Sequence, residues 1–158
     1  MKLWRIAADT PDYTADDLSG KGAEMTGGRW NRKGTPLLYT STSRALACLE
    51  TFAHLNAGAK LPLNRYLIEI DIPDALWLKR AQFTAADFIG WDAEPVGRVS
   101  LDWGTAWARG LTTLMAEVPS VIVAEESNAL INPAHPDAAA VACAKMRKWL
   151  FDPRLRGT

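Results

Sequence analysis

The sequence contains little cysteine and little histidine. Its two cysteines are Cys48 and Cys143, its two histidines are His54 and His135, and the four are scattered without the spacing of a zinc site. We therefore expect no bound metal and no disulfide framework. Both cysteines lie in stretches whose pattern favours a helix, which is compatible with a reducing compartment.

Neither sign of charge is in excess, and long apolar runs are lacking. Lys and Arg number 18, and Asp and Glu also number 18. No overall basic field therefore favours nucleic acid or a membrane surface as a partner. No apolar run approaches the ~20 residues that span a bilayer. The opening Met1–Trp4 does not resemble a secretory signal, so we expect a cytoplasmic protein.

The length of 158 residues and the 48% hydrophobic content predict one domain with a single packed core, residues 1–158. Apolar runs and period-two alternation predict strands at Leu3–Ala8, Leu37–Thr40, Tyr66–Ile72, Leu76–Leu78, Val121–Ala124 and Met146–Phe151. Helical spacing predicts helices at Arg44–Leu55, after Thr84, and from Asp102 until Pro119 stops it. Strands and helices do not alternate regularly, which indicates a mixed α+β domain.

The predicted helix from Arg44 carries the first candidate for chemistry. Ser41-Thr42-Ser43 is suited to N-capping it, and Glu50 falls at the edge of its apolar stripe, where a carboxylate should be half buried. His54, four residues on, could reach Glu50. A structural ion pair between the two would also explain this pattern.

The loop Gly27–Gly34 is the second candidate. Its glycines let the backbone approach a ligand, Arg29 offers a planar fork for a pair of phosphates, and Trp30 offers an indole for stacking. A dinucleotide would suit the loop, although it matches neither GxGxxG nor GxxxxGK[ST]. An exposed basic turn with Trp30 in the core fits equally well.

Tyr39 and Ser120 complete the set, and each has an ordinary structural interpretation. Tyr39, at a strand end, could simply pack in the core with its hydroxyl satisfied. Ser120, between Pro119 and the strand predicted after it, could be a strand-entry residue.

Taken in order, these pieces resemble the RES domain family, which is named for its arginine, glutamate and serine. The resemblance extends from Trp4-Arg5 to the ending Trp149–Arg154. It rests on the runs Gly28-Arg29-Trp30-Asn31, Leu38-Tyr39-Thr40-Ser41, Ala45–Glu50, Val118-Pro119-Ser120 and Asn128–Pro136.

The resemblance implies a fold similar to the ADP-ribosyltransferases, with a central, mainly antiparallel split sheet and flanking helices. It also implies an enzyme that breaks the nicotinamide-ribose bond of NAD, which is a substrate rather than a cofactor. The family residues fall on Arg29, Glu50 and Ser120, with Tyr39 as a pocket aromatic. Arg44 and Trp30 are further candidates for NAD binding.

The roles implied follow from the chemistry. Nicotinamide leaves as a neutral molecule, so the barrier lies in an electron-poor ribosyl cation that Glu50 can stabilise. Arg29 can clamp the pyrophosphate, Tyr39 can stack on nicotinamide, and Ser120 can hold the nicotinamide side or a ribose oxygen. Attack by water, phosphate or a protein side chain would give ADP-ribose, ADP-ribose 1''-phosphate or a modified protein.

The family's toxins act in bacterial toxin-antitoxin pairs and arrest growth. The resemblance therefore implies a helix-turn-helix, Xre-type antitoxin that blocks the pocket and binds DNA in place of the toxin, and it leaves open a homodimer within that complex. Two other functions remain open: an RNA-cleaving toxin that uses Arg29, Arg32 and Lys33 on phosphates, and a non-enzymatic nucleotide-binding domain.

Overall fold

The computed structural model describes residues 1–55 and 60–156, and these residues fold around one mostly antiparallel sheet with the strand order β4-β5-β6-β2-β1-β3-β7. The strands are β1 (Lys2–Ala8), β2 (Leu38–Ser41), β3 (Arg65–Asp71), β4 (Ala81–Gln82), β5 (Met115–Pro119), β6 (Ser127–Ile131) and β7 (Ala142–Lys148). The α-helices are α1 (Lys21–Thr26), α2 (Arg44–Ala53), α3 (Asp74–Leu78) and α4 (Arg98–Gly110), and the 3₁₀ helices are η1 (Ala85–Asp87), η2 (Pro136–Ala140) and η3 (Pro153–Arg156). The expected mixed α+β domain with a mainly antiparallel sheet is confirmed.

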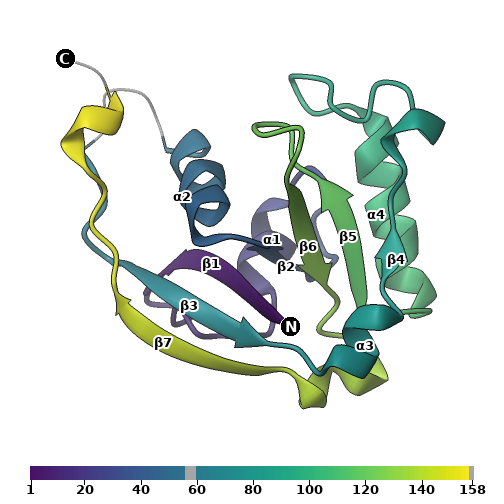
Figure 1. The fold of residues 1–158 in the computed structure, drawn as a ribbon, viewed down its shortest axis with the longest axis horizontal. Helices are drawn as coiled ribbons and strands as arrows, with labels where there is room; N and C mark the ends of the chain where they lie inside the picture. The colour runs from purple at the N-terminus through teal and green to yellow at the C-terminus, as the bar shows by residue number, and fades with distance from the viewer. Residues whose placement is uncertain (56–59, 157–158) are drawn as a thin grey trace.

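The sheet is divided into two halves that join at one point. Strands β1, β3 and β7 form one half, and β2, β6, β5 and β4 form the other (Figure 1). The register of β1 with β2 consists of the single pair Trp4↔Ser41, whereas β1 pairs with β3 along seven residues. Beyond Trp4 the two strands diverge, and this divergence opens the sheet beside its junction.

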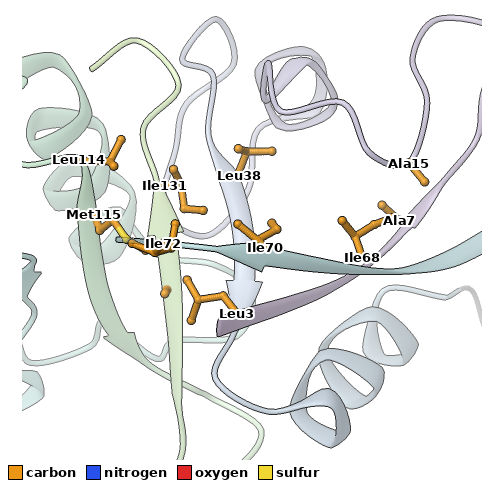
Figure 2. Packing of buried hydrophobic residues seen from close by; sticks show 11 residues of the cluster. Leu3, Ala7, Ala15, Leu38, Ile68, Ile70, Ile72, Leu114, Met115 and Ile131 are labelled. Atoms are coloured by element: carbon orange, nitrogen blue, oxygen red, sulfur yellow. The ribbon is translucent and has the colours of Figure 1, made fainter. Parts of the chain in front are cut away.

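One face of the sheet carries the main apolar core, which draws on both halves. Ile68, Ile70 and Ile72 are 1% exposed or less, and they pack with Leu38 and Ile131 of the other half (Figure 2). The period-two alternation at Tyr66–Ile72 predicted this buried face correctly. Burying these branched side chains supplies much of the force that holds the two halves together.

The opposite face carries two smaller clusters, one on each half. Ala47 of α2 packs with Trp4, Ile6 and Leu67, so this helix covers β1 and β3. Ala108 of α4 packs on the other half, in a cluster that also holds Trp30, Leu37, Phe83, Trp107, Ala116, Val118 and Leu130. The space between these two covered regions is where the site lies.

Helix α4 approaches the loop before β2 closely, and Gly104 makes this approach feasible. A Cβ atom at Gly104 would lie 2.1 Å from the backbone oxygen of Trp30. The indole of Trp30 is 3% exposed, and its ring lies against Phe83, Trp91 and Trp103 with centroids 4.8 to 6.0 Å apart. The loop is therefore anchored by aromatic packing on one side of the cleft.

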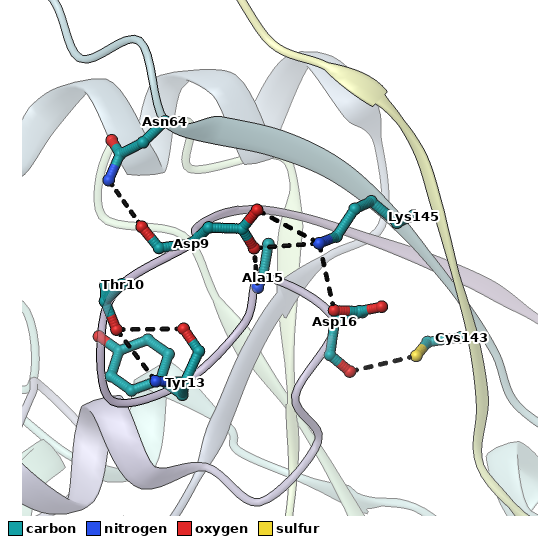
Figure 3. Close-up of polar contacts among 8 residues, drawn as sticks. All are labelled: Asp9, Thr10, Tyr13, Ala15, Asp16, Asn64, Cys143 and Lys145. Carbon is teal, nitrogen blue, oxygen red and sulfur yellow. Dashed lines mark hydrogen bonds and ion pairs between the residues drawn. The ribbon is translucent and has the colours of Figure 1, made fainter.

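The loop that follows β1 is tied to the far edge of the sheet. Lys145 of β7 forms ion pairs with Asp9 at 3.0 Å and with Asp16 at 3.4 Å (Figure 3). The Asp9 carboxylate also accepts a hydrogen bond from the Ala15 backbone at 2.7 Å, and Cys143 Sγ donates to the Asp16 carbonyl at 3.4 Å. A loop without regular structure is thus held in one place over the core.

Several predicted elements were wrong in type or extent. Leu76–Leu78 belongs to helix α3, and Val121–Ala124 forms the turn between β5 and β6 rather than a strand. The helix expected to continue to Pro119 ends at Gly110, where Leu111 adopts a φ of 50°, and Met115 starts strand β5. Cys143 lies in strand β7 rather than in a helix.

Candidate functional site

A cleft of about 1010 Å³ lies where β1 and β2 diverge. Its walls come from β1, the segment containing α1, strand β2, one side of α2, and the β5–β6 turn. Among the residues that line it are Arg5, Tyr13, Arg29, Tyr39, Glu50, His54, Arg65, Glu94 and Asn128. The cleft brings together Arg29, Tyr39 and Glu50, three of the predicted site residues, from three separate parts of the sequence.

Glu50 occupies the wall formed by α2. This helix begins where predicted, because the Ser43 hydroxyl accepts the backbone N–H of Leu46 at 3.1 Å and so caps its first turn. Glu50 is half buried, which confirms the position inferred from the apolar stripe, although Leu49 in the same stripe is 38% exposed. Within the described residues, Glu50 Oε1 receives hydrogen bonds and Oε2 receives none.

Ser120 supports Glu50 from the end of β5. Its hydroxyl donates to Glu50 Oε1 at 2.8 Å and accepts the backbone N–H groups of Ile122 and Val123, each at 3.0 Å. A serine hydroxyl offers one donor and two acceptor lone pairs, so all three are used. Ser120 is 1% exposed and does not line the cleft. Its hydroxyl holds the carboxylate and the turn and has no remaining capacity for a substrate oxygen.

Asn128 is a second support for Glu50, and the sequence had assigned it no role. Its side-chain amide nitrogen donates to Glu50 Oε1, and its Oδ1 accepts the hydroxyl of Ser41 at 2.7 Å. Asn128 lies opposite Ser41 in the β2–β6 register. The run Asn128–Pro136 was the available signal, but nothing local showed that Asn128 faces a glutamate on another element.

Tyr39 lines the cleft with its hydroxyl already engaged. The hydroxyl accepts the Trp30 backbone N–H at 2.9 Å and donates to Asn31 Oδ1 at 2.7 Å. Burial is the main reason that the pKa of Tyr39 is raised above its ordinary value of 10.0, so the phenol is neutral at physiological pH. Asn31 is fully buried and fixes the orientation of the ring through this contact.

Arg29 is engaged more than the sequence indicated. Its Nη1 donates to the carbonyls of Trp91 and Ala93, each at 3.1 Å, and its Nη2 lies 3.1 Å from a carboxylate oxygen of Glu94. These contacts use three of the five guanidinium donors. Arg29 therefore secures the segment at Trp91–Glu94, of which Glu94 lines the cleft. Within the described residues, two of its donors remain for a ligand.

Arg5 is a cleft residue that the sequence reasoning missed. Its guanidinium makes one long hydrogen bond within the described residues, to the Asp17 carbonyl at 3.5 Å. Burial lowers the pKa of Arg5 below its ordinary value, and an arginine so placed keeps its charge. Arg65 lines the cleft too, and its buried Nε has no acceptor in the described part of the chain. An isolated arginine in the apolar run Leu3–Ala8 was the signal for Arg5.

Two candidates for NAD binding have side chains that pack against aromatic rings. Trp30 borders the cleft, but its indole is packed in the core, as the alternative interpretation of the loop proposed. Arg44 is exposed, and its guanidinium lies 3.8 Å from the centroid of the Trp4 ring. It is not among the residues that line the cleft.

The two histidines do not form a general acid–base pair. His54 lies exposed at the cleft, and no ion pair joins it to Glu50 within residues 1–55 and 60–156. His135 caps η2, because its side chain accepts the backbone N–H of Asp137. It follows the Ile131 end of β6, whereas Asn128 lies near the other end of this strand.

Among the described residues, no cluster of three or more His, Cys, Asp or Glu side chains could hold a metal. None of the described helices has the length and apolar character to cross a bilayer.

Comparison with known proteins gives consistent results along the whole chain. A protein of Sphingobium sp. (strain YBL2) named Prs ADP-ribosylating toxin is 57% identical over 154 residues, which cover 97% of this chain and 95% of that protein. Proteins named Toxin Res from Pseudomonas putida and Yersinia enterocolitica are 35% and 33% identical, and each comparison covers at least 99% of both chains.

The family comparison agrees with these relatives and with the motifs in the cleft. The RES domain matches residues 2–153, so the match includes every strand of the sheet and each of the residues placed around Glu50. The chain belongs to the RES domain family.

Proposed function

We propose that this protein is a toxin that cleaves the bond between nicotinamide and ribose in NAD and transfers ADP-ribose to a protein acceptor. The observation that carries the proposal is Glu50, a half-buried carboxylate in the cleft. One of its oxygens is fixed by Ser120 and Asn128, and the other is free within the described residues. The name of the Sphingobium relative supports transfer rather than simple hydrolysis.

The free oxygen of Glu50 would stabilise the ribosyl cation. The pyridinium of NAD carries a positive charge, and nicotinamide takes the bonding electron pair when it leaves as a neutral molecule. The positive charge then develops on the ribose, where a fixed carboxylate lowers the barrier without reorganising. The same oxygen can accept a hydrogen bond from a ribose hydroxyl or from the incoming nucleophile.

The basic side chains of the cleft would hold the diphosphate. Arg5 has few acceptors of its own, and Arg29 keeps two donors after binding the segment at Trp91–Glu94. A guanidinium that lacks acceptors in a cleft is suited to a phosphate oxygen. The ring of Tyr39, fixed by its bonded hydroxyl, would pack against the nicotinamide.

The acceptor would be a protein of the kind named for the Sphingobium relative, Prs. We also propose that the toxin acts in the cytoplasm, is paired with a helix-turn-helix antitoxin that blocks the cleft, and does not itself bind DNA. The Toxin Res names of other relatives support a toxin of this kind.

Incubation of the purified protein with NAD tests the reaction, and the products distinguish its acceptors. Nicotinamide release together with labelling of Prs by biotinylated NAD is the expected result. Free ADP-ribose without labelling would indicate water as the acceptor, and ADP-ribose 1''-phosphate would indicate phosphate. An unchanged NAD concentration, with or without loss of added RNA, would overturn the proposal.

A further inference from the structure

We infer that Ser41 is a positioning residue for Glu50, acting through the side-chain amide of Asn128. The inference rests on the proposed function, since it concerns how that reaction's carboxylate is aimed. Ser41 ends β2 and pairs with both Trp4 of β1 and Asn128 of β6. It therefore lies at the single point where the two halves of the sheet meet.

The direction of the hydrogen bonds carries the argument. The Ser41 hydroxyl donates to Asn128 Oδ1 at 2.7 Å, which leaves the amide nitrogen of Asn128 facing Glu50 Oε1. If the amide rotated by half a turn, its oxygen would face the carboxylate, and two acceptors would be in contact. The Glu50 carboxylate, which only accepts, excludes the rotated amide, and the Ser41 hydroxyl holds the remaining orientation in place by donating to Oδ1.

Burial makes this hydrogen bond effective. Ser41 is 3% exposed, and Asn128 and Glu50 are half buried. Water cannot readily replace a lost donor at such a position, and a hydrogen bond to a charged group is stronger than one between neutral groups. Two donors, from Ser120 and Asn128, converge on Oε1. Their common effect is to occupy Oε1 and to leave Oε2 without a hydrogen bond in the described part of the chain.

The neighbouring hydroxyls provide the contrast. Thr42 donates to the Ser127 carbonyl at 2.9 Å, and Ser43 donates to Glu126 at 2.8 Å while it caps α2. All three consecutive hydroxyls thus tie the β2–α2 junction to the start of β6. In the described part of the chain, only the residue bound by Ser41, Asn128, is itself hydrogen-bonded to Glu50. The three hydroxyls therefore stabilise the junction, and that of Ser41 also positions Glu50.

The test compares Ser41→Ala with Thr42→Val, since each variant removes one hydroxyl bond to β6. We expect Ser41→Ala to lower kcat for NAD cleavage about ten- to a hundredfold with KM within a few-fold, as orienting partners typically do. Ser41→Thr keeps the hydroxyl and should recover most of the parent kcat. Thr42→Val should reduce stability and leave kcat within a few-fold.

A double-mutant cycle separates aiming from general damage. If Ser41 acts through Asn128, then Ser41→Ala in an Asn128→Ala background should cause little further loss of kcat. Additive losses, or a parent-like kcat in Ser41→Ala, would overturn the inference while the parent still cleaves NAD. A parent that does not cleave NAD would instead refute the proposed function. If Ser41→Ala melts early, the Ser41→Thr variant and the cycle at lower temperature still decide the question.

Discussion

Ser120 donates its hydroxyl hydrogen to Glu50 Oε1 at 2.8 Å, although the two residues are 70 positions apart in the sequence. The pair brings together in space the two residues to which the resemblance assigns the family's glutamate and serine. The serine fixes the carboxylate and does not need to touch the substrate. Both residues then contribute to one electrostatic feature, the orientation of a single negative charge in the cleft.

Replacing Glu50 by glutamine should strongly reduce NAD cleavage and leave the fold intact. The amide oxygen of glutamine can still accept from Ser120 and Asn128, so the variant removes the charge and keeps the two contacts. We expect kcat to fall by about a hundredfold or more, the range for loss of one preorganised electrostatic group. Nicotinamide release measured by chromatography gives kcat, and a thermal melt shows whether the fold is kept. Turnover within a few-fold of the parent would contradict the role of Glu50.

Arg5→Lys should weaken NAD binding with a small effect on stability. Lysine keeps the positive charge but cannot hold two phosphate oxygens with a planar fork. In a Glu50→Gln background, calorimetry should show a loss of about 1.5 to 3 kcal/mol in NAD binding, the range for a charged hydrogen-bond partner. Unchanged affinity would remove Arg5 from the binding site.

Arg29→Lys should differ from Arg5→Lys by lowering stability as well as NAD affinity. A lysine cannot reach the carbonyls of Trp91 and Ala93 and also Glu94, so acceptors that Arg29 now satisfies would lose their donor. We expect the free energy of unfolding to fall by about 1–3 kcal/mol in a urea titration. Equal stability of parent and variant would show that these contacts are replaced by water. Unchanged NAD affinity in the same background would show that Arg29 only shapes the wall.

Gly104→Ala should be strongly destabilising, because its methyl group would lie 2.1 Å from the Trp30 backbone oxygen. Backbone cannot move aside as a flexible side chain does, so α4 would shift away from the aromatic cluster. Gly110→Ala is the matched control in the same helix, since a Cβ atom there would lie 3.9 Å from Thr112 Cγ2, which is an ordinary van der Waals distance. We expect Gly110→Ala to be neutral or to stabilise by about 0.5–1 kcal/mol. Similar melting temperatures for the two variants would contradict the close approach.

The Lys145 contacts should make stability depend on pH in the acid range. The backbone N–H of Ala15 and the ammonium of Lys145 lower the pKa of Asp9 from 3.8, and Thr14 and Lys145 are among the groups that lower the pKa of Asp16. A lowered pKa contributes stability that is complete above the unfolded value and is lost as pH falls through the folded value. The parent should therefore lose stability below about pH 4.

Lys145→Met removes the ion pairs and keeps a long side chain over the Tyr66 ring, where the ammonium now lies 4.8 Å from the centroid. Its melting temperature should be lower than that of the parent at pH 7, and the difference should narrow toward pH 3. Equal melting temperatures for the two proteins at every pH in this range would show that the ion pairs contribute no measurable stability.

The sequence predicted those parts of the fold whose pattern is local. The alternation in β3, the cap at Ser43 and the half-buried Glu50 each depend on spacing within about ten residues. The pattern failed at Met115, which keeps helical spacing after Trp107 because α4 and β5 both turn apolar side chains toward the core. Periodicity records which side chains are buried, and it does not record where the backbone changes conformation.

The sequence named part of the candidate site as residues but gave none of its contacts. Of the residues to which the family resemblance assigned roles, Arg29, Tyr39 and Glu50 line one cleft, and Ser120 and Arg44 do not. The resemblance did not show that Arg29 binds carbonyls 62 and 64 positions away, or that Asn128 supports Glu50. Such contacts depend on how distant elements are brought together, and a single sequence carries no direct information on that.

The junction at Trp4 and Ser41 is the one place where the two halves of the sheet are joined by strand pairing among the described residues. Because one residue pair joins the two halves of the sheet there, few backbone hydrogen bonds resist their separation, and side-chain packing does most of that work. A ligand that contacts Arg5 in one half and Tyr39 in the other links the two halves of the sheet. Its binding energy adds to the cohesion of the whole domain. Occupancy of the cleft is therefore coupled to the free energy of unfolding of the protein.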